Sequence, residues 1–191
     1  MRANRDSNLV KRLEKVMARY GRLDIAFNNA GVEQDATPLP EQTETAYDRI
    51  MDINVKGVWL SLKHEIPAML KNGGGAIVNT SSGSGLVGGA RVPIYTDSKH
   101  AVIGLTKLVA LEYAKLGIRV NTVSPGLIQT EMLDRSVQTN TELMEYFKTT
   151  LPMGRIGTPQ EVVNAVLWLC SDASSFVTGE SIAVDGGYTA Q

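Results

Sequence analysis

Apolar residues in the first part of the chain recur at the spacing of one helix face. They run from Leu9 to Tyr20, and Gly21 follows them as a typical helix stop. Residues 23–28 then form a short apolar run that ends in the turn-forming sequence Asn-Asn-Ala-Gly, which is typical of a buried strand. The chain is therefore predicted to open with an amphipathic helix followed by a strand.

Two longer segments, residues 47–70 and 95–116, have helical spacing but carry apolar residues around most of the helix. A helix of that kind must be covered on more than one side. Each is followed by a short apolar run, at residues 76–80 and 119–124, which we expect to be a strand. Strands therefore alternate with helices through the middle of the chain.

The last third of the chain is less regular. Residues 127–157 are mixed and polar, which indicates short helical pieces and loops. Thr158, Pro159 and Glu161 match a capping box with proline at the first helical position, so a helix is predicted to begin there. Residues 181–185 form the last predicted strand. This alternation predicts an α/β fold with a mostly parallel sheet covered on both faces.

Composition excludes several classes of function. The 191 residues suffice for one domain with a core, and the formal net charge of -1 provides no field to hold a nucleic acid. The chain has one cysteine, Cys170, and two histidines, His64 and His100, which are too few for a disulfide framework or a Cys/His zinc site. We therefore expect no metal and a reducing, cytoplasmic location. No apolar stretch reaches the roughly 18 to 20 residues of a membrane span, so no membrane partner is expected.

Ligands of parallel α/β sheets bind beyond the carboxyl ends of the strands. Three predicted strands end there in polar or turn-forming sequence, at residues 28–31, 81–82 and 125–126. Tyr95 begins a helix with Lys99 four residues later, which puts the phenol and the ammonium on one face. Because a free tyrosine titrates near 10, an ammonium at roughly 5 Å, worth about 3 kcal/mol, would lower its pKa toward the range useful for proton transfer.

The pair of Tyr95 and Lys99 alone is a weak indication of a catalytic site, and two further polar residues strengthen it. Ser82 lies 13 residues before Tyr95, just past a strand end, where its hydroxyl can meet the phenol. Asn54 lies within a long predicted helix, where an amide suits an apolar surface poorly, and it fits a structural and a functional role about equally. A Ser-Lys hydrolase built on Ser98 and Lys99 lacks the Gly-x-Ser-x-Gly elbow and is set aside.

Together these motifs resemble those of the short-chain dehydrogenase/reductase family, in the family's order and spacing and over essentially the whole chain. The resemblance rests on five motifs: Asn28-Asn-Ala-Gly31, Asn54, Ser82, Tyr95-x-x-x-Lys99, and Ser124-Pro-Gly126 with Thr130. It implies a Rossmann-like fold, a doubly wound parallel sheet in a three-layer α/β/α arrangement. It also implies an NAD(P)-dependent oxidoreductase that transfers a hydride between a nicotinamide cofactor and a secondary alcohol or ketone.

The resemblance assigns a role to each candidate residue. Tyr95 would be the general acid and base, and Lys99 would lower its pKa and bind the nicotinamide ribose. Ser82 would position the substrate oxygen, and Asn54 would hold a water in the proton relay. The cofactor is NAD or NADP, with a slight preference for NAD. The residues implied to border its adenosine side are Asn28, Asn29, Ala30 and Gly31, and those implied to hold its carboxamide are Pro125, Gly126, Ile128 and Thr130.

The amino-terminal part of the sequence departs from the family. Family members begin with a strand and a Thr-Gly-x-x-x-Gly-x-Gly loop that holds the pyrophosphate, and nothing in this sequence resembles either. We therefore expect residues 1–191 to form a single Rossmann-like domain that is amino-terminally truncated, without the first βαβαβ portion. Two alternatives stay open: an active oxidoreductase, or an inactive family member or gene fragment that only binds or oligomerises.

The two long predicted helices also indicate self-association. Both are apolar on more faces than one sheet can cover, and members of the family often pair through such helices. We expect a homo-oligomer, a dimer or a tetramer, formed through residues 47–70 and 95–116. The identity of the substrate stays open, because residues 127–157, which are expected to line its pocket, carry no readable chemical signature.

Overall fold

A four-stranded parallel sheet forms the centre of the chain. The computed structural model describes residues 3–137 and 149–191. The strands lie side by side in chain order: β1 (Ile25–Asn28), β2 (Gly75–Thr80), β3 (Ile118–Pro125) and β4 (Ser181–Val184). All three pairings are parallel, as the alternation of strands and helices in the sequence predicts.

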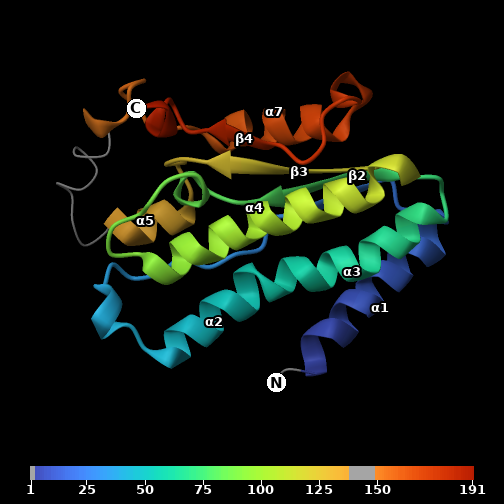
Figure 1. Ribbon diagram of the computed structural model, residues 1–191, viewed down its shortest axis with the longest axis horizontal. Coiled ribbons are helices and arrows are strands. Elements are labelled where there is room, and N and C mark those ends of the chain that lie inside the picture. Colours follow the sequence, from blue (N-terminus) through green and yellow to red (C-terminus); the bar gives the residue numbers. More distant parts are fainter. Residues whose placement is uncertain (1–2, 138–148) are drawn as a thin grey trace.

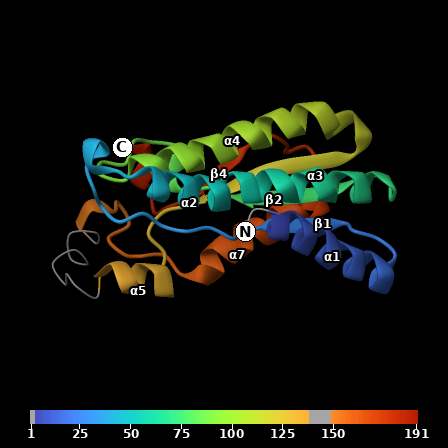
Figure 2. The same ribbon diagram turned by 90° about the horizontal axis from the view of Figure 1, so that it is seen from below.

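Helices cover both faces of this sheet (Figure 1). α3 (Lys56–Leu70) and α4 (Pro93–Tyr113) lie along one face, and α7 (Pro159–Cys170) lies on the other. α1 (Ala3–Tyr20) packs against α3 and lies beside it in both views (Figures 1 and 2). The other helices described are α2 (Glu44–Asn54) and α5 (Glu131–Val137). The Rossmann-like three-layer α/β/α arrangement is confirmed.

Two apolar clusters hold these layers together. One joins α3 and α4 to the sheet through buried residues such as Met69, Val102 and Ile77. The other joins α7 to the opposite face through Leu169 and Val123. The two central strands, β2 and β3, are therefore buried on both faces, which explains why their sequences read as unbroken apolar runs instead of alternating ones.

The helix predicted over residues 47–70 is interrupted. It forms two helices, α2 and α3, that meet at Val55. Asn54 is the last residue of α2, is 1% exposed, and turns its amide to the backbone of Val32. The predicted mid-helix position of Asn54 is therefore wrong, because this side chain is bound by a loop at a helix junction and does not lie on a continuous apolar surface.

The ends of α4 also differ slightly from the sequence prediction. The helix begins at Pro93, two residues early, because proline suits the first helical position. It ends at Tyr113, and a 3-10 turn leads to Gly117, whose φ of 80° favours glycine. Farther along the chain, α5 is one of the short helical pieces expected within residues 127–157, whereas residues 138–148 of that segment lie outside the described part.

The turns that lead into β2 and β3 touch at the amino-terminal edge of the sheet. A Cβ atom on Gly74 would overlap the carbonyl oxygen of Gly117, and the φ of Gly74 is 135°. Only glycine fits this position without displacing the neighbouring turn. The N–H of Gly75 donates to the same carbonyl oxygen over 3.0 Å. These contacts fix the two central strands relative to each other at the edge opposite the predicted site.

β1 is the edge strand of the described sheet. Among residues 3–137 and 149–191 no strand pairs with its free side, and Ile25 and Phe27 are 52% and 42% exposed. α1 precedes β1, so the described residues contain no glycine-rich loop between a strand and a helix ahead of it. The expected absence of a first βαβαβ portion stays a prediction.

Candidate functional site

Three loops meet at the carboxyl-terminal edge of the sheet. Asn28 pairs in register with Asn79, and Thr80 pairs with Val123, so the ends of β1, β2 and β3 lie next to one another. The polar and turn-forming segments singled out in the sequence follow directly after these ends. The structure therefore gathers the candidate residues at the edge that the sequence predicts.

Tyr95, Lys99 and Ser82 lie together at this edge. Tyr95 and Lys99 are one turn apart on α4, and the Lys99 ammonium nitrogen is 5.5 Å from the centroid of the phenol ring. The side chain of Ser82, at the start of the loop after β2, lies close enough to the Tyr95 hydroxyl to lower the pKa of the phenol. The Ser82 hydroxyl also accepts a hydrogen bond of 3.2 Å from the N–H of Ser84, which orients it.

The ammonium group of Lys99 is buried, with only 4% of the residue exposed. Its Nζ donates to the carbonyl oxygen of Thr80 over 3.1 Å. Burial lowers the pKa of Lys99 to about 8, so Lys99 is still protonated in most molecules at neutral pH. A buried cation at the ends of parallel strands indicates a functional site more than a stabilising contact.

The pKa of Tyr95 is raised above its ordinary value. Burial of the phenol is the largest cause, the Ser82 side chain opposes it, and the negative charge of Glu33 raises the pKa further. This direction is opposite to the one predicted from the spacing of Tyr95 and Lys99, because burial of the phenol dominates and Lys99 is not among the causes of the shift. The phenol is therefore protonated at neutral pH and able to donate its proton.

Asn54 connects a loop with the turn of α4 that carries Tyr95. Its Oδ1 accepts from the N–H of Val32 over 2.8 Å, and its Nδ2 donates to the Val32 carbonyl oxygen over 3.0 Å. The same Nδ2 donates to the hydroxyl of Ser98 over 3.1 Å, and Ser98 donates to the carbonyl oxygen of Tyr95 over 2.7 Å. Ser98 thus helps to position the site, a role that the sequence analysis misses when it considers Ser98 only as a nucleophile.

Asn28 belongs to a buried polar network. Its Nδ2 donates to Glu65 Oε2 and to Asn79 Oδ1, each over 3.0 Å, and Asn79 donates to the hydroxyl of Thr106 over 2.9 Å. The network joins β1 and β2 to α3 and α4. Burial raises the pKa of Glu65, although the hydrogen bond from Asn28 opposes this shift. The available sequence signal was Glu65 itself, the single carboxylate within α3.

The rest of residues 28–31 lies closer to the catalytic candidates. Asn29 and Ala30 are exposed, and Asn29 Oδ1 accepts from the hydroxyl of Thr80 over 2.9 Å. A Cβ atom on Gly31 would lie 3.4 Å from Lys99 Nζ and equally far from the side-chain oxygen of Asn54. The absence of a side chain at position 31 therefore leaves free space beside the buried ammonium.

The loop after β3 packs close to the end of β4. Pro125 ends β3, and a Cβ atom on Gly126 would collide with Asp185. The hydroxyl of Thr130 donates to the carbonyl oxygen of Ile128 over 3.3 Å at the start of α5. Ile128 lines a cavity of about 300 Å³ beside this loop. These four predicted cofactor-binding residues thus lie in one loop, on the other side of β2 from residues 28–31.

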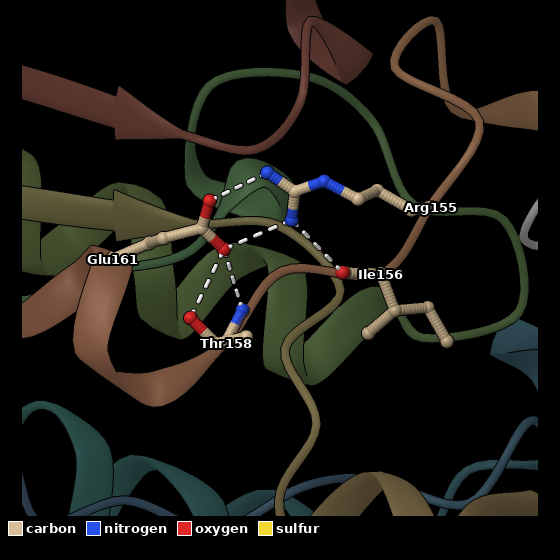
Figure 3. A network of polar contacts seen from close by, with 4 residues as sticks. All are labelled: Arg155, Ile156, Thr158 and Glu161. Atoms are coloured by element: carbon tan, nitrogen blue, oxygen red, sulfur yellow. Dashed lines mark hydrogen bonds and ion pairs between the residues drawn. The ribbon is translucent and has the colours of Figure 1, made fainter.

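A second polar cluster borders the same cavity (Figure 3). Two guanidinium nitrogens of Arg155 donate to the carboxylate of Glu161, over 3.0 and 2.6 Å, and Glu161 also accepts from the N–H and the hydroxyl of Thr158. Arg155 together with these Thr158 contacts lowers the pKa of Glu161 to about 2. The cluster is the predicted capping box of α7 with an arginine added, so it fixes the start of a helix and supplies no reactive group.

In the described part of the chain, no group of three His, Cys, Asp or Glu side chains could hold a metal ion. His64 pairs with Asp6 over 2.6 Å, and His100 contacts the carbonyl oxygen of Thr96 over 3.0 Å. None of the helices described combines the length and the apolar character needed to cross a membrane.

Comparison with known proteins adds independent evidence. A family model described as "Enoyl-(Acyl carrier protein) reductase" matches residues 3–189. The 2,5-dichloro-2,5-cyclohexadiene-1,4-diol dehydrogenase of Sphingobium indicum is 45% identical over 177 residues, which are 92% of this chain and 71% of that protein. The crystal structure of levodione reductase superposes with a TM-score of 0.94 at 34% identity, covering 97% of this chain and 74% of that one. The structure of ElxO with NADP bound gives a TM-score of 0.92 at 34% identity, covering 97% and 75%.

These similarities agree with the motifs and with the arrangement of the site. The family model spans almost the whole chain, and the relatives named as a dehydrogenase or a reductase share both sequence and fold with it. The chain belongs to the short-chain dehydrogenase/reductase family.

Proposed function

We propose that the chain carries the catalytic part of an NAD(P)-dependent oxidoreductase that transfers a hydride between a nicotinamide cofactor and a secondary alcohol or ketone. One observation carries the proposal: the side chain of Ser82 lies next to the Tyr95 hydroxyl, with the buried ammonium of Lys99 5.5 Å from the centroid of the phenol ring. The relatives support the reaction class, since they are named as dehydrogenases and reductases.

Tyr95 moves the proton in this proposal. Its raised pKa keeps the phenol protonated at neutral pH, so Oη can donate to the substrate oxygen during reduction of a ketone. In the direction of alcohol oxidation the phenolate must accept the proton, so this direction gains rate as the pH rises. Ser82 holds the substrate oxygen next to the phenol through a second hydrogen bond. Asn54 contacts Ser98 and, in this proposal, holds a water of the proton relay that leads to Tyr95.

A nicotinamide cofactor supplies or accepts the hydride in this chemistry. The residues present fit such a group, because Lys99 gives one N–H to Thr80 and has two more to donate, and Gly31 leaves space beside it. In the proposal Lys99 binds the ribose. The adenosine side is bordered by Asn28, Asn29, Ala30 and Gly31, and the carboxamide is held by Pro125, Gly126, Ile128 and Thr130. NADP is bound in the ElxO structure. NAD is the cofactor that we test first.

Replacement of Tyr95 by phenylalanine tests the assignment. This change keeps the packing and removes the proton carrier, so turnover should fall by about 10²-fold or more. Cyclohexanol and cyclohexanone are suitable probes, assayed at millimolar NAD or NADP from about pH 6 to 10. Tyr47→Phe is the control, because Tyr47 is 48% exposed on α2 and should leave turnover unchanged. Near wild-type turnover of Tyr95→Phe across this range would rule out the proposed role.

A second candidate function is a chain that binds or oligomerises without turnover. It is favoured by the free edge of β1 and by the lack, among the described residues ahead of β1, of a strand followed by a glycine-rich loop and a helix, which is the usual pyrophosphate site. We therefore propose that residues 1–191 bind NAD and NADP no better than millimolar. Calorimetric titration and the shift in melting temperature measure this. A micromolar dissociation constant for either cofactor would contradict it and favour the enzyme.

We also propose that copies of the chain pair through α2, α3 and α4. An apolar groove of about 540 Å³ runs between these helices, with Trp59, Leu105, Leu108 and the small Gly104 in its lining. Trp59 and Leu108 are 48% and 52% exposed in the single chain. The same helices of a second copy, related by a two-fold axis, would cover this surface. The partner in this proposal is a second copy of the chain.

A further inference from the structure

The amino end of α4 has no cap within its own sequence. Val92, the residue before the helix, makes no side-chain hydrogen bond to it, and Pro93 at the first helical position has no N–H. The first N–H groups of any helix lack partners inside the helix, and leaving such a group buried and unpaired is costly. The N–H of Tyr95, at the third helical position, is one of these groups.

The partner of this N–H comes from a distant loop. The side-chain oxygen Oε1 of Gln34 accepts the hydrogen bond of the Tyr95 N–H over 2.8 Å, from 61 positions away in the sequence. The other end of the same amide, Nε2, is buried and has no hydrogen-bond partner among the described residues. Gln34 therefore does for α4 what an N-cap side chain does, and it also fixes the helix end to the loop after β1.

This loop is itself held to the rest of the site. Val32, two residues before Gln34, donates its N–H to the Asn54 side chain over 2.8 Å and accepts from it through its carbonyl oxygen over 3.0 Å. On the other side of Gln34, the N–H of Thr37 donates to the carbonyl oxygen of Arg91 over 2.8 Å, just ahead of α4. Arg91 has a φ of 66°, a conformation that a non-glycine residue keeps only when its neighbours hold it. Gln34 thus acts from a fixed position.

We propose that Gln34 is a positioning residue for Tyr95, which sets the place of the phenol relative to Ser82 by accepting the Tyr95 N–H. The inference rests on the proposed role of Tyr95 as proton carrier. A displacement on the order of 1 Å at a reacting group can lower the rate by about 10²-fold. Gln34 contacts the backbone of Tyr95 and not the reacting atoms, so its loss should lower kcat and leave the KM for the cofactor unchanged.

Two substitutions separate the acceptor from the rest of the side chain. Gln34→Met has about the same length and no acceptor, whereas Gln34→Glu keeps an oxygen at the same distance, and a carboxylate suits the amino end of a helix. We expect Gln34→Met to lower kcat for ketone reduction near pH 7 by about tenfold, with the cofactor KM within about twofold of wild type. Gln34→Glu should restore kcat to within about threefold of wild type. Should Gln34→Met fail to fold, Gln34→Asn replaces it, since its oxygen lies one methylene short.

A second measurement does not need turnover. The Tyr95 amide proton should exchange with solvent about tenfold faster in Gln34→Met than in the wild-type chain, while Gln34→Glu keeps the wild-type rate, as followed by NMR. The amide of Val102, in the middle of α4, is the internal control and should be equally protected in all three proteins. Unchanged exchange of the Tyr95 amide in Gln34→Met would overturn the proposal.

The kinetic results complete the test. Altered exchange with unchanged kcat would also overturn the proposal, because Gln34 would then stabilise the helix end only. Equal loss of kcat in Gln34→Met and Gln34→Glu would do so as well, because the acceptor would not be the relevant atom. A wild-type chain without any turnover would instead contradict the proposed function, and the exchange rates would still decide whether Gln34 holds Tyr95.

Discussion

Replacing Thr106 by valine should destabilise the protein by about 1 to 2 kcal/mol without changing its shape. Thr106 and Asn79 are 1% and 0% exposed, and the Asn79 amide donates to the Thr106 hydroxyl over 2.9 Å. Valine fills the same volume but cannot accept this hydrogen bond. A buried donor left unpaired costs about 1 to 3 kcal/mol. The added methyl group recovers less than about 1 kcal/mol through burial of apolar surface.

Urea unfolding followed by circular dichroism measures this loss. The midpoint should fall with an unchanged slope, and the melting temperature should drop by roughly 2 to 8 °C, at about 2 to 4 °C per kcal/mol for a chain of this size. Thr45→Val is the matched control, because Thr45 is exposed on α2, and it should change the free energy of unfolding by less than about 0.5 kcal/mol. The reasoning is refuted if Thr106→Val stays within about 0.5 kcal/mol of wild type, or if both variants lose the same amount.

Three further substitutions test other contacts. The pKa of Glu65 is raised, so the contribution of this side chain to stability is present below the usual value of 4.5 and is lost as the pH rises through the folded-state pKa. Glu65→Gln still accepts the hydrogen bond from Asn28 and does not titrate. Its melting temperature should therefore rise relative to that of the wild type between about pH 4 and 8. A difference that stays constant with pH would contradict this. The pKa of Glu161 is lowered to about 2, so its contribution is present above 4.5 and is lost as the pH falls through about 2; melting curves of Glu161→Gln should lie below wild type at neutral pH and converge with it in acid. Leu108→Glu should convert a dimer to a monomer in sedimentation experiments, whereas Leu111→Glu, 83% exposed and outside the groove lining, should not, and a monomeric wild type would refute the pairing.

Much of the fold could be predicted from the sequence, because the features that define it are local. The apolar run at residues 23–28 and those that precede Ser81 and Ser124 each became a parallel strand, although the first of them lies at the edge of the described sheet and is half-exposed. The capping box at Thr158 marked the start of α7. In each case the period of apolar residues or the chemistry of one turn determines the local structure. The interruption at Val55 was not predicted, because it accompanies the contact of Asn54 with a loop 22 residues earlier in the chain.

The residues of the site also differ in whether a local sequence pattern identifies them. Tyr95 and Lys99 were found because a helix places them on one face, and Ser82 because it follows a strand end. Gln34 and Ser98 were missed as positioning residues, because their partners lie on other elements and no short-range pattern marks such a hydrogen bond. Their contacts become visible only when the loop after β1 has been placed against α2 and α4.

The direction of the pKa shift of Tyr95 could not be predicted from the sequence, for a different reason. A spacing of four residues gives the separation of the two charged groups and therefore the sign of their attraction. It gives no measure of how much water the surrounding elements remove. Burial of the phenol is a property of the assembled edge, and in the folded chain it is the largest of the causes that shift this pKa.

The contact between Gly74 and Gly117 bears on how proteins of this kind can diversify. Because the turns before β2 and β3 interlock at one edge, a larger residue at either glycine would displace both central strands together. We therefore expect substitutions of Gly74 and Gly117 to reduce the amount of folded protein. At the opposite edge Gly126 and Gly157 are restricted as well, because a Cβ atom there would overlap Asp185 or Ile128. The side chains of Leu127 and Met153, which line the cavity between these glycines, can vary without moving a strand. A library for directed evolution should accordingly vary Leu127 and Met153 and keep residues 73–75, 117, 126 and 157 fixed.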